Sequence, residues 1–116
     1  MKAAGATRAQ LARSATLFAA LGDATRLQLI MRLSDDGSQS ITRLTRGLSL
    51  TRQAVTKHLR VLARAGVARS VPSGRESRWS VEAERLEVAR RYLDLVAATW
   101  DDRLKALERH LATSDR

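Results

Sequence analysis

Apolar residues in the first half of the chain recur every three or four positions, which is the spacing of one helix face. Two of these stretches follow a residue suited to N-capping, Asp23 or Thr51, and two end before a glycine, Gly22 or Gly66. Residues 35–38, Asp-Asp-Gly-Ser, have the composition of a loop. The pattern predicts helices over residues 8–21, 24–34, 40–47 and 51–65.

The core is expected to form from the apolar residues that share one face of each helix. Aromatic residues make up only 3% of the chain, so this core must consist of aliphatic side chains. The apolar positions of these helices are Leu11, Ala15, Phe18 and Leu21, then Leu27, Ile30, Met31 and Leu33, then Ile41 and Leu44, and finally Val55, Leu59 and Leu62, of which the last three must bury against the domain.

After Gly66 the periodicity changes. Residues 67–71 and 77–81 have the composition of two strands, and Pro72-Ser73-Gly74 that of the turn between them. A long helix is expected over residues 82–112. The predicted fold class is therefore mainly α with a small β-hairpin, in the order α-α-α-α-β-β-α.

The 116 residues are expected to form one domain. The longest wholly apolar run, Leu17–Leu21, is far too short to span a membrane, and no apolar signal segment follows the N-terminus. We therefore expect a cytoplasmic protein. The expected parts are a flexible segment over 1–7, a helix-turn-helix over 40–66, a wing over 67–81, and terminal helices over 8–21 and 82–112.

The positive charge is concentrated in the middle of the chain. Residues 42–78 contain nine Lys and Arg against one acid, Glu76, and carry +8 of the formal net charge of +9. A basic field on a helix-turn-helix followed by a hairpin is typical of a DNA-binding protein. Double-stranded DNA is therefore the expected partner.

The predicted helix over 51–65 has one apolar face and one face rich in DNA-binding chemistry. Arg and Gln can bond base edges in the major groove, and a Thr methyl can contact a thymine methyl. Arg52, Gln53 and Thr56 are the base-reading candidates, because the first turn of a recognition helix supplies such contacts. Arg60 and Arg64 are expected to reach phosphates. The alternative is a merely solvated face, but such a face normally mixes both signs of charge.

The hairpin adds three arginines, Arg69, Arg75 and Arg78, around its turn. A basic hairpin beside a helix-turn-helix has the layout of a wing, which can place Arg in a minor groove or along phosphates. A solubilising surface turn is the alternative. Trp79, in the returning strand, is expected to pack in the core or at a hinge.

Three separated motifs resemble those of the ArsR-type winged helix-turn-helix repressors. They are Leu21-Gly22-Asp23-Ala24-Thr25-Arg26-Leu27, then Ala54-Val55-Thr56-Lys57-His58-Leu59-Arg60-Val61-Leu62, then Ala65-Gly66-Val67. The ending around Trp100 is similar to the branch without metal sites, in agreement with the absence of cysteine. The resemblance implies dimers that bind inverted repeats through a recognition helix. At the matching positions it implicates Thr51, Arg52, Gln53, Thr56, Lys57 and Arg60.

Neither a metal site nor an enzyme is expected. The only histidines are His58 and His110, and three or four converging ligands are needed to hold a metal. Asp101 and Asp102 are neighbours on a helix, about 100° apart, and so form no catalytic pair. No cofactor is expected. His58 is interpreted as either a structural hydrogen-bonding group or a phosphate contact.

The last predicted helix carries an apolar stripe about 37 Å long, from Leu86 to Leu111. The first helix can cover part of it, and a second subunit can cover the rest, which predicts a homodimer. Packing within one chain is the alternative. The expected interface residues are Leu11, Phe18, Leu93, Val96, Trp100, Leu104 and Leu107.

These observations favour a dimeric, sequence-specific transcription regulator, most simply a repressor of an inverted-repeat operator. A sequence-blind architectural DNA-binding protein is the main alternative, and a winged-helix module for protein or RNA is a third. The operator, the regulated genes and any small-molecule effector are not encoded in a form that the sequence reveals.

Overall fold

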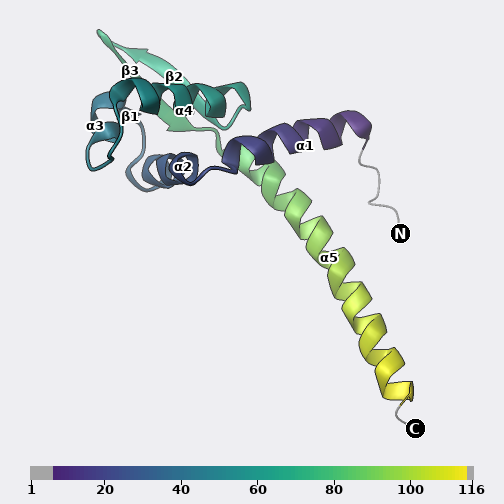
Figure 1. The fold of residues 1–116 in the computed structure, drawn as a ribbon. Helices are drawn as coiled ribbons and strands as arrows, with labels where there is room; N and C mark the ends of the chain where they lie inside the picture. The colour runs from purple at the N-terminus through teal and green to yellow at the C-terminus, as the bar shows by residue number, and fades with distance from the viewer. Residues whose placement is uncertain (1–6, 115–116) are drawn as a thin grey trace.

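The computed structural model describes residues 7–114 (Figure 1). Helices and a small sheet alternate in the order α-α-β-α-α-β-β-α. The elements are α1 (Arg8–Leu21), α2 (Ala24–Asp36), β1 (Gln39–Ser40), α3 (Ile41–Thr45), α4 (Arg52–Arg64), β2 (Ala68–Ser73), β3 (Glu76–Val81) and α5 (Ala83–Ser114). The predicted mainly helical class with a hairpin is confirmed.

Side-chain caps begin the first two helices. Thr7 Oγ1 accepts a hydrogen bond from Gln10 N at 3.1 Å, and Thr7 N donates to Gln10 Oε1 at 2.8 Å, which is a capping box. The prediction of a flexible segment is therefore wrong at Thr7, while residues 1–6 lie outside the described residues. Asp23 caps α2 as predicted, accepting from Arg26 N at 3.0 Å.

Helix α2 runs further than the sequence predicted. The expected loop at 35–38 begins only at Gly37, whose φ of 80° ends the helix, so Asp35 and Asp36 are helical. The helical hydrogen bonds continue through residues 35 and 36 as far as Gly37, whose N–H donates to Leu33 O at 3.0 Å. The turn-forming composition of this stretch therefore did not locate the end of the helix.

The sheet has three antiparallel strands in the order β1-β3-β2. The predicted hairpin is present, with register pairs from Ala68↔Val81 to Ser73↔Glu76, so its strands extend closer to the turn than expected. Strand β1 was not predicted. It adds Gln39 and Ser40 to the other edge of β3, opposite Trp79 and Arg78, and so fixes the base of the wing to the start of α3.

The core lies where α1, α2, α3 and α4 meet one another and the base of the sheet. Its fully buried side chains are Leu17, Leu29, Leu44, Val55, Leu59, Leu62 and Val67, and Trp79 is buried at its edge, as predicted. Several apolar positions of the first two helices are open to solvent: Leu11, Leu27 and Met31 are 42%, 48% and 59% exposed, and Ala15 is exposed as well. On α1 and α2 the buried face instead runs through Leu17, Ala20, Leu29, Ile30 and Leu33.

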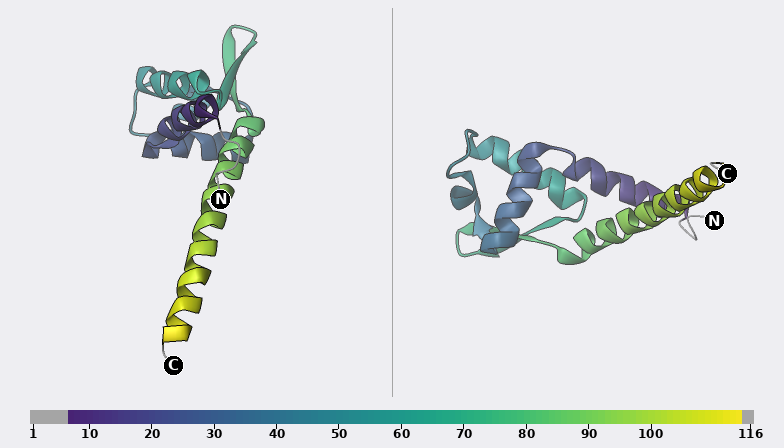
Figure 2. Two further views of the ribbon diagram at one scale, coloured as in Figure 1. Left: turned by 90° about the vertical axis from the view of Figure 1, so that its right-hand side faces the viewer. Right: turned by 90° about the horizontal axis from the view of Figure 1, so that it is seen from below.

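Helix α5 leaves this body as a single long rod, and α1 crosses it near its beginning (Figures 1 and 2). The contact includes a tilted pair of rings, Phe18 and Tyr92, with centroids 5.8 Å apart. The molecule measures 72 × 30 × 20 Å, and the rod accounts for most of its length. No helix among the described residues is both long and apolar enough to cross a membrane.

Candidate nucleic-acid interface

Helix α4 has the two faces that the sequence predicted. Val55, Leu59 and Leu62 are fully buried, and each such burial stabilises the fold by about 1.5–3 kcal/mol. The opposite face is open to solvent. It presents Arg52, Gln53, Lys57, Arg60 and Arg64 as exposed side chains, with Thr56 partly buried between them.

The hydroxyls of the first turn of α4 are engaged with its backbone. Thr51 Oγ1 accepts from Ala54 N at 3.1 Å, which makes Thr51 the N-cap. Thr56 Oγ1 donates to Arg52 O at 2.8 Å. Thr56 therefore has its methyl group, rather than its hydroxyl proton, available for a contact, while Arg52 and Gln53 are exposed.

The end of α4 is held just as firmly. Gly66 has a φ of 80°, its N–H donates to Ala63 O at 3.0 Å, and Val67 N donates to Leu62 O at 2.9 Å. This is a Schellman motif, in which a glycine takes the left-handed position. A Cβ on Gly66 would lie 2.9 Å from Arg85 Nε, so the Arg85 side chain would have to shift, and the positive φ is what favours glycine there.

The hairpin of β2 and β3 projects from the body beside α4 (Figure 1). Every residue from Arg69 to Arg78 is exposed, which suits a wing. Its three predicted DNA-binding arginines differ, however, in what they contact. Arg75 lies at the turn and has no ion-pair partner among the described residues.

Arg69 and Arg78 are both held by other parts of the protein. Arg69 Nε lies 2.9 Å from Glu82 Oε1, so its charge is partly compensated. Arg78 donates from Nη2 to Ser38 O at 2.7 Å and from Nε to Ser38 Oγ at 3.2 Å, and so joins the wing to the loop before β1. The contact between Arg78 and Ser38 could not be predicted from spacing along the chain, because the two residues are 40 positions apart.

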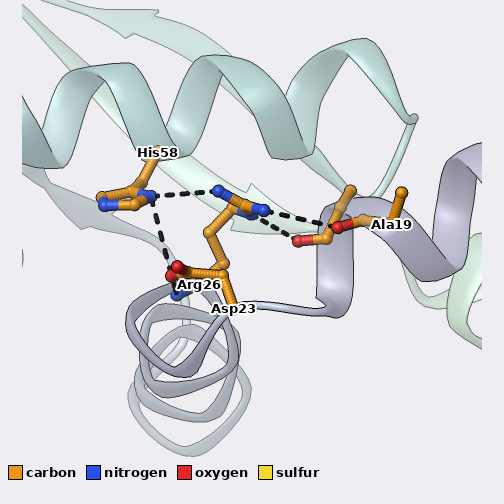
Figure 3. Close-up of polar contacts among 5 residues, drawn as sticks. Ala19, Asp23, Arg26 and His58 are labelled. Atoms are coloured by element: carbon orange, nitrogen blue, oxygen red, sulfur yellow. Dashed lines mark hydrogen bonds and ion pairs between the residues drawn. The ribbon is translucent and has the colours of Figure 1, made fainter.

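His58 has a structural contact on the inner side of α4. Its Nδ1 lies 3.3 Å from Arg26 Nη1 and 3.8 Å from Asp23 Oδ2 (Figure 3). Arg26 also donates to Ala20 O at 2.5 Å and to Ala19 O at 3.3 Å. These contacts join α4 to the end of α1 and the start of α2. They agree with the interpretation of His58 as a structural hydrogen-bonding group rather than as a phosphate contact.

The same cluster lowers the pKa of Asp23 below its ordinary value of 3.8. The main cause is the hydrogen bond that Arg26 N donates to the carboxylate, followed by desolvation, which opposes it, and by the positive charge of Arg26. The sequence marked Asp23 as a cap but did not reveal that Arg26 and His58 would surround it.

The residues predicted for a dimer interface lie mainly along α5 and are largely exposed. Leu93, Val96, Trp100, Leu104 and Leu107 are 40–57% exposed. Leu11 on α1 is also open, whereas Phe18 packs on Tyr92 of its own chain. The indole of Trp100 additionally has the guanidinium of Arg103 5.5 Å from its ring centroid.

Comparisons with known proteins agree with this geometry. A helix-turn-helix domain family model matches residues 21–71. The chain is 40% identical over 65 residues to the uncharacterised HTH-type transcriptional regulator YuzN of Bacillus subtilis, covering 51% of this chain and 71% of that protein. A second uncharacterised HTH-type transcriptional regulator, from Methanocaldococcus jannaschii, is 29% identical over 62 residues, with 53% and 70% covered.

Among solved structures, the chain is similar to an ArsR-like transcriptional regulator from Rhodococcus sp. RHA1. The TM-score is 0.75 and the identity 37%, over 87% of this chain and 94% of the other. The similarity therefore extends well beyond the helix-turn-helix, into the wing and the terminal helices.

Proposed function

Since this chain belongs to the ArsR-type winged helix-turn-helix family of DNA-binding transcription regulators, which are not enzymes, we propose that it acts as a dimeric, sequence-specific repressor. In this proposal, α4 enters the major groove of an inverted-repeat operator and the wing contacts the adjacent DNA. Each subunit reads one half-site.

The observation that carries the proposal is the exposed face of α4. Arg52, Gln53, Lys57, Arg60 and Arg64 are all exposed, and residues 42–78 contain only one acid. A helix with capped ends that presents this set can bond both base edges and phosphates. Gln53 and Thr56 are proposed as base-reading residues, and Lys57, Arg60 and Arg64 as phosphate contacts.

The exposed stripe on α5 supports the dimeric part of the proposal. Monomeric proteins rarely leave a continuous row of large apolar side chains open to water. Pairing of α5 and α1 with the same helices of a second copy buries that row and sets a fixed distance between the two copies of α4.

Selection of bound fragments from random duplexes, at physiological salt, tests the proposal. We expect a palindromic consensus whose two half-sites are about one helical turn apart, bound roughly 10³-fold or more tightly than random DNA. A flat profile with strong salt-dependent binding would instead identify an architectural protein. Absence of duplex binding would contradict both functions.

A further inference from the structure

A notch separates the beginning of α4 from the turn of the wing. Its volume is about 190 Å³. The elements that contribute its lining, α3, the start of α4 and the hairpin turn, lie at the same end of the molecule (Figure 1). Three separate segments of the chain line it, contributing Ser40, Ile41, Thr42, Arg52, Arg75, Glu76 and Ser77.

The lining chemistry suits an anion. Two arginines, Arg52 and Arg75, line the notch, and neither forms an ion pair with any acid in the described range 7–114. The hydroxyl residues Ser40, Thr42 and Ser77 add hydrogen-bonding groups. One carboxylate, Glu76, also lines the notch and opposes an anion there.

The position of the notch matches the path of a DNA strand. A sugar-phosphate strand separates each major groove from the neighbouring minor groove. A recognition helix in the major groove and a wing beside it must therefore have that strand between them. The notch lies between these two elements, and arginine is the side chain best suited to grip a phosphate with paired donors.

We propose that this notch is a phosphate site that holds one phosphodiester group of the DNA backbone between Arg52 and Arg75. The proposal rests on the DNA-binding function argued above and refines it. It changes the interpretation of Arg52, which the sequence had placed among the base-reading residues. It also gives the wing turn a specific task, because Arg75 completes a site that α4 begins.

Salt dependence tests the site without any knowledge of the operator. The logarithm of the binding constant falls by about 0.9 per decade of salt for each phosphate contacted in B-DNA. Because both arginines hold the same phosphate, Arg52→Ala with Arg75→Ala should lower the slope by about 0.9 per bound subunit. An unchanged slope would overturn the proposal. So would a reduction of about 1.8 per bound subunit, which would mean that each subunit contacts two separate phosphates with these arginines.

Neutralising single phosphates tests the same point on the selected operator. Scanning each half-site with methylphosphonate linkages should reveal one position where the wild-type protein loses about tenfold in affinity. Arg52→Ala and Arg75→Ala should each become less sensitive at that same position, and the double variant insensitive. Two different positions, or an altered base preference in Arg52→Ala, would overturn the proposal.

Two further variants serve as controls. Arg64→Ala removes an equal charge from the other end of α4 and should keep the sensitivity at the notch phosphate. Glu76→Gln should bind every duplex more tightly, because it removes the one opposing charge. If the wild-type protein shows no sequence preference, the proposed repressor function is wrong. The salt slopes still decide in that case whether the notch binds a phosphate.

Discussion

Individual charged side chains in this protein have roles that their partners define. Arg26 donates to carbonyls at the end of α1 and lies within 3.3 Å of His58, and it thereby connects the first helix to α4. Asp23 combines a helix cap with proximity to two basic side chains. This small cluster adds polar contacts between α4 and the body of the domain to the apolar packing of Val55, Leu59 and Leu62.

The lowered pKa of Asp23 predicts a specific response to acid. Because the folded-state pKa lies below the ordinary value of 3.8, its stabilisation is fully present above about pH 4 and is lost as the pH falls through the lowered value. Asp23→Asn retains the capping oxygen but does not titrate. We expect its thermal midpoint to lie below that of the wild type at pH 7 and to converge with it as the pH falls below about 4.

The matched control is Asp36→Asn, at the far end of the same helix, which should follow the wild-type profile. If the thermal midpoints of the wild type and Asp23→Asn differ by the same amount at every pH, the stabilisation does not come from the lowered pKa of Asp23.

Helix α4 is an element fixed at both ends. Thr51 caps its beginning, and the Schellman motif at Gly66 ends it against Arg85 of α5. Its apolar face is fully buried, so the helix has one available orientation. The backbone positions from which the outward side chains project are consequently fixed relative to the domain, as sequence-specific recognition requires.

Gln53 provides the test of base reading by this element. Gln53→Ala should weaken binding to the preferred operator by about 1–3 kcal/mol and relax the preference at one base pair in each half-site, with the salt slope unchanged. Binding to a panel of single-base operator variants measures both effects.

Lys57→Ala is the matched comparison on the same face of α4. Loss of a phosphate contact should weaken binding to all operator variants equally and should reduce the salt dependence of the binding constant. An equal loss across the panel for Gln53→Ala would exclude it from base reading.

At the scale of the whole molecule, α5 has two parts, one that packs on the domain and one that projects from it. Its beginning packs on α1 and reaches the end of α4 through Arg85, whose guanidinium lies 3.4 Å from Ala65 O. The remainder extends away with its apolar row exposed. The projecting part of α5 gives the domain its extent of 72 Å. In the proposed dimer, a second copy covers the exposed apolar row on this part of the helix.

Leu104→Glu should disrupt that interface. A charge at the centre of an apolar contact cannot be solvated once it is buried, so we expect a monomer in sedimentation experiments and a large loss of operator affinity. Ala106→Glu adds the same charge away from the stripe and should remain dimeric. A Leu104→Glu variant that stays dimeric would contradict the role of α5.

Much of the fold was predictable because its signals are local. Helical periodicity and the caps at Asp23 and Thr51 located α1, α2 and α4, and the hairpin followed from its turn residues. Strand β1 was not predictable, because two residues carry no periodicity and become a strand only by pairing with β3. The sequence did not show which apolar residues of α2 are buried, because Leu27 and Met31 continue the apolar spacing and yet are exposed, whereas Leu29 is fully buried.

The sequence by itself determined the main helices and the hairpin, the apolar stripe of α5 and the basic block over residues 42–78, since these depend on residue type and spacing alone. Only the tertiary structure decided which basic residues are committed within the protein. It pairs Arg69 with Glu82 and Arg78 with Ser38, and it brings Arg52 and Arg75 to one notch. The physical reason is that charge is a property of a residue, whereas a partner is a property of the folded chain.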